Sequence, residues 1–257
     1  EDGVYSIDQE DLEEKLADPQ TSMLILCNPH NPVGKIWDRE TLERIGELCF
    51  KHHVLVLSDE IHCDITRPGM EYIPFASVSE HCKNNSITCV APTKTFNLAG
   101  LQTAAVIVPD AALRHRVNRG LNTDEVAEPN VFAAIAPIAA FDRGREWLEE
   151  LREYLWENRK FAEDFIREEI PELRTVSADA TYLLWIDCNA LPGDLSELAE
   201  FIRKESGLYV CDGREYGNGY GFLRMNLACR RELLKEGLER LKRSIHSYRK
   251  GISNGII

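Results

Sequence analysis

Apolar runs of strand length recur through the first half of the chain, separated by helical or polar stretches. Four such runs occupy residues 23–27, 54–57, 86–90 and 104–108. Between the first two, apolar side chains recur at the spacing of one helix face, at Leu42, Ile45, Leu48 and Cys49. A strand followed by a helix and another strand is typical of βαβ units. This half therefore predicts an α/β fold with a mostly parallel sheet, covered by helices on both faces.

Helical patterns dominate the second half, with shorter strand-like runs between them. Helices are expected at residues 111–121, 130–141, 146–169, 196–206 and 232–248, and strands at residues 182–186, 208–210 and 222–227. We place a domain boundary before the long charged helix, where the pattern changes. Residues 1–141 then belong to a large α/β domain, and residues 142–257 form a smaller α+β domain that includes the long helix.

The composition excludes several classes of function. The 257 residues carry 30 Lys and Arg against 43 Asp and Glu, a net charge of −13. Because binding to a nucleic-acid backbone or an anionic lipid surface requires clustered cations, we predict neither partner. The eight cysteines show no C-x-x-C spacing, which favours reduced thiols in a cytoplasmic protein over a disulfide framework or a metal site. No stretch resembles a signal peptide or a membrane helix.

Polar clusters lie where predicted strands end. Asn31 lies in the loop NPHNPVG, Asp59 and His62 in SDEIH, Lys94 in APTKTFNLAG, and Arg224 in the strand-like segment FLRMN. In open α/β sheets the carboxyl ends of the strands form the edge that binds ligands. These five side chains are therefore the candidate site, with Lys94, expected in a loop, at its centre.

A lysine, an aspartate and an arginine together suit an enzyme that handles amino acids with an aldehyde cofactor. Lys94 can form a Schiff base with pyridoxal phosphate, and Asp59 can keep the ring nitrogen of that cofactor protonated. Asn31 and His62 can hydrogen-bond its phenolic oxygen. Arg224 has the planar fork that pairs with the carboxylate of an amino acid. The expected substrate is thus a small amino acid.

Each of these residues also has a structural interpretation. Lys94 can be a solvated loop residue, Asp59 a helix cap, and Asn31 part of a turn. His62 can hydrogen-bond the backbone, and Arg224 can form an ion pair between domains. The occurrence of all four clusters in one chain favours the cofactor site over these interpretations.

The four segments resemble the fold-type I pyridoxal-phosphate enzymes of the class I/II aminotransferase superfamily, from about residue 3 to residue 248. The sequence motifs SDEIHCD and KTFNLAGLQ are most similar to those of the MalY/PatB branch, the cystathionine or cysteine-S-conjugate β-lyases. The resemblance implies that Lys94 holds the cofactor, that Asp59 pairs with its pyridine nitrogen, and that Asn31 contacts its phenolic oxygen. It implies that Arg224 binds the substrate carboxylate. It also implies a homodimer and a lyase that releases a thiol, pyruvate and ammonia.

The chain departs from the family pattern in several places. His62 stands where many aminotransferases carry tyrosine, Gln102 where many relatives carry a phosphate-binding arginine, and Ala91 where a serine is common. Thr93 is the candidate for the phosphate contact that remains. The N-terminal portion with which relatives bind the phosphate has no counterpart before the first strand. We therefore expect the chain to match the C-terminal two-thirds of the enzyme and, alone, to hold the cofactor weakly.

Three functions remain open from the sequence: a C–S β-lyase, a class I/II aminotransferase, and a non-catalytic remnant or binding protein. The clusters serve a lyase and an aminotransferase equally well, because both reactions begin with loss of the α-proton. Only the resemblance of the motifs to the MalY/PatB branch favours the lyase.

Overall fold

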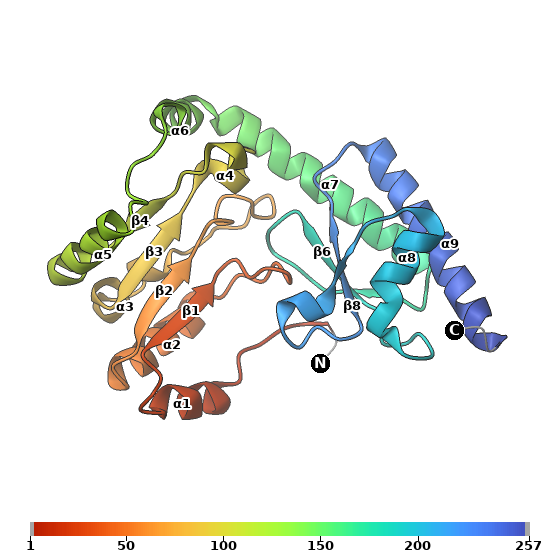
Figure 1. The fold of residues 1–257 in the computed structure, drawn as a ribbon, viewed down its shortest axis with the longest axis horizontal. Helices are drawn as coiled ribbons and strands as arrows, with labels where there is room; N and C mark the ends of the chain where they lie inside the picture. Colours follow the sequence, from red (N-terminus) through yellow and green to blue (C-terminus); the bar gives the residue numbers. More distant parts are fainter. Residues whose placement is uncertain (1–2, 255–257) are drawn as a thin grey trace.

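The computed structural model describes residues 3–254, which form two lobes connected by one long helix (Figure 1). The first lobe is built on a sheet with the order β1-β2-β3-β4. Its first three strands are parallel to one another, and β4 is antiparallel to β3. These strands are β1 (Met23–Cys27), β2 (Leu55–Asp59), β3 (Ser86–Val90) and β4 (Ala105–Ile107). The predicted α/β fold with a mostly parallel sheet is confirmed.

The helices of the first lobe lie before, between and after these strands, and three of them contribute buried side chains to the core on one face of the sheet. The helices of this lobe are α1 (Gln9–Ala17), α2 (Arg39–Lys51), α3 (Glu80–Asn84), α4 (Pro92–Thr95), α5 (Ala111–Thr123) and α6 (Val131–Arg143), with 3-10 turns η1 (Phe75–Ser77) and η2 (Ala99–Leu101). The side chain of Asp38 caps α2 by accepting a 2.8 Å hydrogen bond from the Thr41 N–H. The apolar face of α2 then packs on the strands through Leu42, Ile45 and Leu48, which are buried.

The opposite face of the sheet is less covered. Met23 and Ile25 alternate along β1 with side chains that pack in the core, and they are 43% and 69% exposed. Ile107 on β4 is 50% exposed. Within residues 3–254, helices thus cover the face of the sheet that carries α2, as expected. They leave part of the opposite face uncovered.

The second lobe contains an antiparallel sheet with the order β5-β6-β8-β7. Its strands are β5 (Arg174–Thr175), β6 (Leu183–Asp187), β7 (Cys211–Asp212) and β8 (Phe222–Asn226). Its helices and 3-10 turns are α7 (Arg145–Glu169), η3 (Leu195–Glu197), α8 (Leu198–Ser206), η4 (Gly213–Tyr216) and α9 (Arg231–Ser253). The predicted α+β pattern is present here, and none of the described helices has the length and apolarity required to cross a bilayer.

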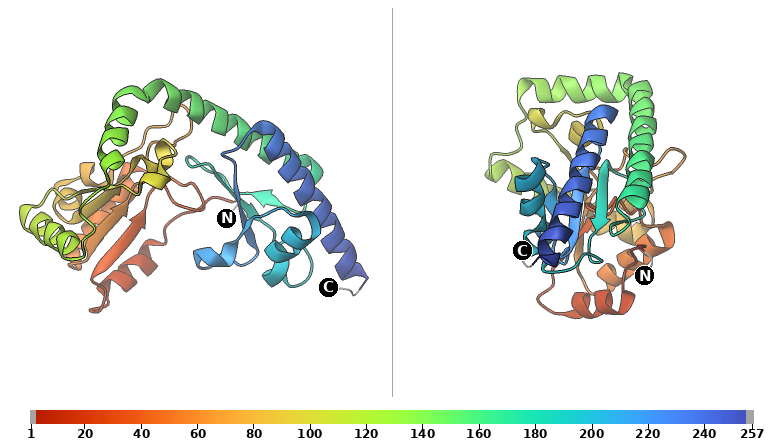
Figure 2. Two further views of the ribbon diagram at one scale, coloured as in Figure 1. Left: turned by 45° about the horizontal axis from the view of Figure 1, so that its top comes forward. Right: turned by 90° about the vertical axis from the view of Figure 1, so that its right-hand side faces the viewer.

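One continuous hydrophobic core holds the second lobe together. Helices α7 and α9 run side by side, and α8 packs against α9 (Figure 2). Leu184 and Ile186 of β6 contribute fully buried side chains, as do Leu238 and Leu241 of α9. The alternate residues of β8, Leu223 and Met225, face the same core. Its other alternate residues therefore face the first lobe, and Arg224 is one of them.

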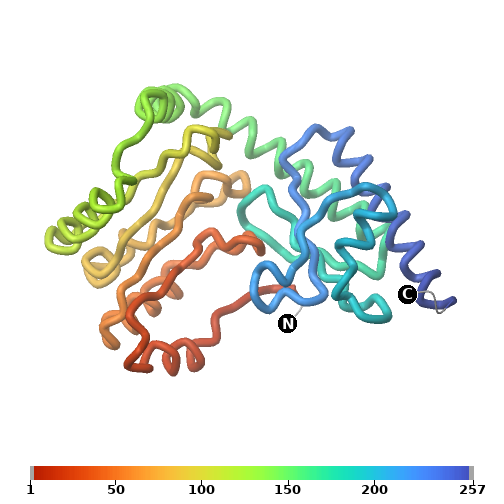
Figure 3. Tube along the Cα trace, in the orientation of Figure 1, coloured from red at the N-terminus to blue at the C-terminus, as the bar shows by residue number. Residues whose placement is uncertain are grey.

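The loop after β1 is one of the bridges between the lobes. Figure 3 shows this loop leaving the first sheet toward the second lobe. The Gly34 carbonyl accepts hydrogen bonds from the Asp179 N–H at 2.8 Å and the Ala180 N–H at 2.9 Å. Gly34 has a φ of +78°, and a Cβ there would lie 2.5 Å from the Ala180 carbonyl oxygen. Only glycine fits this close approach, because both its conformation and its lack of a side chain are needed.

The link between the lobes falls near the boundary predicted from the sequence. Helix α6 ends at Arg143, and α7 begins at Arg145. The division into residues 1–141 and 142–257 stays a prediction, since the last residues of α6 lie on the C-terminal side of it.

Candidate active site

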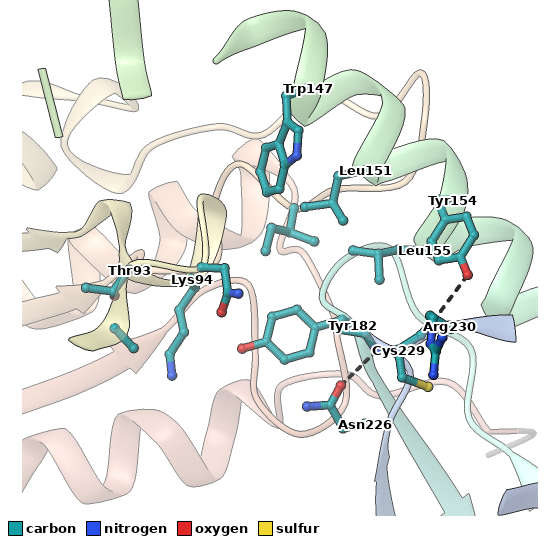
Figure 4. A pocket seen from close by; sticks show the side chains of 14 residues that line it. Thr93, Lys94, Trp147, Leu151, Tyr154, Leu155, Tyr182, Asn226, Cys229 and Arg230 are labelled. Atoms are coloured by element: carbon teal, nitrogen blue, oxygen red, sulfur yellow. Dashed lines mark hydrogen bonds between the residues drawn. The ribbon is translucent and has the colours of Figure 1, made fainter. Parts of the chain in front are cut away.

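Lys94 is positioned by a short helix at the end of β3. The sequence predicted a loop here, but Pro92 occupies the first turn of α4, where its fixed φ favours a helix start. The Thr95 hydroxyl donates a 2.8 Å hydrogen bond to the Asp64 carboxylate, which joins this helix to the segment after β2. The side chain of Lys94 lines a cavity of about 510 Å³ between the lobes, and Thr93 lines it as well (Figure 4).

Asp59 is the last residue of β2, at the same edge of the sheet. It is paired in register with Cys27 of β1 and with Cys89 of β3, so the carboxyl ends of three parallel strands meet here. One carboxylate oxygen accepts a 3.2 Å hydrogen bond from the Ile61 N–H, which fixes the turn that follows the strand. Asp59 is half-buried. Its partner in β3 is Cys89, and Lys94 follows Cys89 by five residues.

Glu60, which was not predicted from the sequence, connects the turn after β2 to a distant part of the chain. Its side chain is buried and accepts hydrogen bonds from the Ser58 hydroxyl at 2.9 Å and from the Phe75 N–H at 3.0 Å. Burial raises the pKa of the Glu60 carboxyl, and the nearby Asp59 adds to that effect. Its partners come from the strand and from a distant 3-10 turn, so no local sequence signal predicts this network.

His62 is buried between groups from both lobes. Only 3% of its surface is exposed, and its Nδ1 makes no hydrogen bond to any residue that the structure describes. Its ring meets the Tyr182 ring edge to face, with centroids 5.7 Å apart. Burial, together with the positive charges of Lys94 and Arg224, lowers the pKa of His62 to about 4. The imidazole is therefore neutral at pH 7, with an unused polar atom inside the site.

Arg224 reaches across from the second lobe to the first. One guanidinium nitrogen donates to the Asn31 amide oxygen at 3.1 Å, and another donates to the Cys211 sulfur at 3.3 Å. The guanidinium carbon lies 4.5 Å from the centre of the Tyr216 ring. Its partners are thus an amide, a thiol and an aromatic ring, which leaves its charge available for an anion. Sequence reasoning missed Cys211 and Tyr216, which belong to no motif.

The five predicted residues come together at the junction of the lobes. Asn31 and Arg224 are in direct contact, and His62 lies within the electrostatic influence of both Arg224 and Lys94. Asp59 lies at the end of β2, at the edge of the sheet from which these loops leave. Gln102, at the position where relatives carry a phosphate-binding arginine, is exposed in a left-handed conformation at the end of η2. The chain thus gathers a primary amine, a carboxylate, an imidazole and a guanidinium.

The fold and the site place the chain among α/β proteins that gather their functional side chains at the carboxyl edge of a mostly parallel sheet. The chain belongs to the aminotransferase class I and II family, which it matches over residues 3–241. It is 43% identical over 245 residues to cystathionine beta-lyase PatB of Bacillus subtilis (strain 168), and 33% identical over 240 residues to protein MalY of Escherichia coli (strain K12). The resemblance to the MalY/PatB branch is thereby confirmed.

The solved structures show the same relationship. Cystalysin from Treponema denticola, whose crystal structure contains pyridoxal 5′-phosphate, superimposes with a TM-score of 0.93 at 31% identity. That match covers 96% of this chain and 63% of cystalysin. The matches to the two curated relatives cover 95% and 93% of this chain, but only 63% and 61% of the relatives. The chain therefore spans less than two thirds of the proteins that it resembles.

Proposed function

We propose that the protein is a pyridoxal-phosphate-dependent C–S β-lyase that cleaves cystathionine or other S-substituted cysteines. One observation carries the proposal: Arg224 of the second lobe donates a 3.1 Å hydrogen bond to Asn31, in the loop after β1, beside the sheet edge where Asp59 ends β2 and Lys94 follows β3. A site that pairs an amine with a separate carboxylate-binding guanidinium suits an α-amino acid. The similarity to the cystathionine β-lyase of Bacillus subtilis supports the lyase outcome.

The residues present fit the cofactor. His62 Nδ1 is a buried polar atom without a partner among residues 3–254, and a phenolic oxygen would satisfy it. Asp59 offers the half-buried carboxylate that would face a protonated ring nitrogen. The Lys94 amine lines a cavity and can attach covalently to an aldehyde. Asn31 and Thr93 would add contacts to the phenolic oxygen and the phosphate.

When bound, the cofactor supplies a protonated ring that accepts the electron pair left behind on the α-carbon. Arg224 holds the carboxylate of the amino acid in its planar fork, which fixes the orientation of the α-carbon. The Lys94 amine is the general base that takes the proton from this carbon. Because His62 is neutral at pH 7, it adds no positive charge that would compete with Arg224 for the carboxylate.

Elimination then breaks the bond between Cβ and sulfur. The electron pair from the α-carbon forms the Cα–Cβ double bond, and the sulfur leaves as a thiolate that takes up a proton. Water hydrolyses the remaining enamine to pyruvate and ammonia. The overall reaction consumes one water per cystathionine and needs no oxidant, reductant or 2-oxo acid.

The role of Lys94 is tested by the visible absorbance of the protein with pyridoxal phosphate. Lys94→Ala removes the amine, so we expect the absorbance of the covalently attached cofactor to disappear. Lys160→Ala, which changes an exposed lysine of α7, is the matched control and should keep this absorbance. A Lys94→Ala protein with the full visible band and unchanged activity would disprove the assignment.

The lyase and the aminotransferase are separated by their products. We expect cystathionine alone, without a 2-oxo acid, to give pyruvate and homocysteine in equal amounts. An aminotransferase instead needs an added 2-oxo acid as acceptor and releases no thiol, and that result would refute the lyase. A homodimer in the cytoplasm is the state that we propose for the protein, and its mass in solution tests the first part.

A further inference from the structure

A cavity of about 510 Å³ opens beside Lys94, on the side facing α7 (Figure 4). Trp147 and Leu151 of α7 form one wall, and Tyr182 forms another with its hydroxyl end toward Lys94. Asn226 and Arg230 line the end near the second lobe. We call this space the α7 cavity. The proposed chemistry uses Lys94 and gives Thr93 a contact to the phosphate, but it gives no role to the other residues that line this space.

The α7 cavity begins one step along β8 from the proposed carboxylate-binding residue. Arg224 and Asn226 are alternate residues of this strand and lie on the same face. Residues two apart along a strand are about 7 Å apart. An amino acid held by Arg224, with its α-carbon at Lys94, can therefore extend its side chain over Asn226 into the cavity.

The walls of the α7 cavity favour one kind of group. They are largely apolar or aromatic, and no aspartate or glutamate is among the described residues that line it. The charged groups at its borders, Lys94 and Arg230, are both cations. An apolar group gains free energy by leaving water here, whereas a cationic group would lose water without finding an anion.

We propose that the α7 cavity binds the group attached to the substrate sulfur, and that it selects apolar or aromatic substituents over cationic ones. This inference rests on the proposed lyase function, because it assigns the leaving thiol of that reaction to a place in the structure. Trp147 and Leu151 determine the specificity by contact with this group.

The test compares S-benzyl-L-cysteine with S-(2-aminoethyl)-L-cysteine on the protein with pyridoxal phosphate. We expect a kcat/KM at least about tenfold higher for the benzyl compound, from burial of its ring. Leu151→Glu places an anion in the wall and should lower this preference at least about tenfold, because the anion attracts the ammonium group of the aminoethyl compound. Its effect on the α-carboxylate is the same for both compounds and cancels in the ratio. An unfolded variant would lose activity on both compounds, so a loss of folding cannot change the ratio of their kcat/KM values in this way.

Leu148→Glu is the matched control. Leu148 lies on the same helix, is partly exposed like Leu151, and does not line the α7 cavity. It should leave the ratio of the two substrates unchanged. Trp147→Glu is a second variant in the wall, and because Trp147 is 45% exposed it is expected to fold if Leu151→Glu does not. It should shift the ratio in the same direction as Leu151→Glu.

Equilibrium binding of both compounds, measured by calorimetry, separates the two proposals. If neither compound yields pyruvate but the benzyl compound binds more tightly and Leu151→Glu removes that preference, the lyase is refuted and the cavity assignment stands. If pyruvate forms but Leu151→Glu and Trp147→Glu leave the ratio as it is in Leu148→Glu, the cavity assignment is overturned. The absence of binding by both compounds would overturn it as well.

Discussion

The buried imidazole of His62 should make the stability of the protein depend on pH in a specific way. Its pKa is lowered from 6.5 to about 4, first by burial and then by Lys94 and Arg224. In the unfolded chain the same group has its ordinary pKa. As the pH falls from 6.5 toward 4, the unfolded state therefore binds a proton at His62 that the folded state does not bind, and folding stability is lost. The stabilisation is complete above pH 6.5.

The size of this loss follows from the pKa difference. At about 1.4 kcal/mol per pKa unit, the fall to about 4 corresponds to about 3 kcal/mol once the pH is below both values. At pH 5, where the folded imidazole is still neutral, the loss is about 2 kcal/mol. His62→Gln cannot titrate, so its free energy of unfolding should fall by about 2 kcal/mol less between pH 7 and pH 5 than that of the unsubstituted protein.

The measurement is urea unfolding at pH 7 and pH 5 without added cofactor, followed by circular dichroism. His115→Gln, at an exposed position on α5, controls for the loss of an imidazole from the surface and should behave as the unsubstituted protein does. Parallel pH dependence of the unsubstituted protein and His62→Gln would refute the reasoning. It would mean that the folded protein protonates His62 as readily as the unfolded chain does.

Two further substitutions test the junction and the buried charge. Gly34→Ala should destabilise the protein by about 2 kcal/mol or more, since its Cβ would lie 2.5 Å from the Ala180 oxygen at a φ of +78°. Gly69→Ala is the control, because Gly69 has a φ of +81° and no atom lies within 4 Å of the added Cβ. It measures the destabilisation from the backbone conformation alone, and thermal unfolding should show a smaller loss of stability than for Gly34→Ala. Arg159→Met should lower the free energy of unfolding by about 2 kcal/mol or more, because buried Arg159 donates to the Leu183 carbonyl, which would lose its partner. An unchanged midpoint for Arg159→Met would show that water replaces the guanidinium.

The elements with the clearest apolar patterns were predicted closely. The run at residues 23–27 became β1, and residues 86–90 became β3, because short runs rich in apolar and β-branched residues favour strands. The face of α2 was predicted from helical spacing. Short elements were missed or misplaced. The strand expected at residues 208–210 lies instead at Cys211–Asp212, where it is only two residues long and pairs at the sheet edge.

Four of the five candidate residues were found in the sequence because they end or follow a strand, whereas Arg224 lies within one. Most of the residues around them were not found. Tyr182, Cys211 and Tyr216 surround His62 and Arg224 through tertiary packing. A tyrosine or a cysteine in a loop carries no local signal of such a contact. Which residue supports a site from a distant part of the chain is decided by the way two lobes pack, and single-sequence patterns do not contain that information.

The position of Arg224, the proposed carboxylate-binding residue, depends on the same packing. Arg224 belongs to the second lobe, whereas Asn31, which accepts its hydrogen bond, lies in the loop that also carries Gly34. That loop is bonded to the second lobe through the Gly34 carbonyl. The contact that orients the guanidinium and one of the contacts that connect the lobes are thus three residues apart in one loop. The distance between the proposed carboxylate clamp and Lys94 is therefore set by the junction between the lobes and not by either lobe alone.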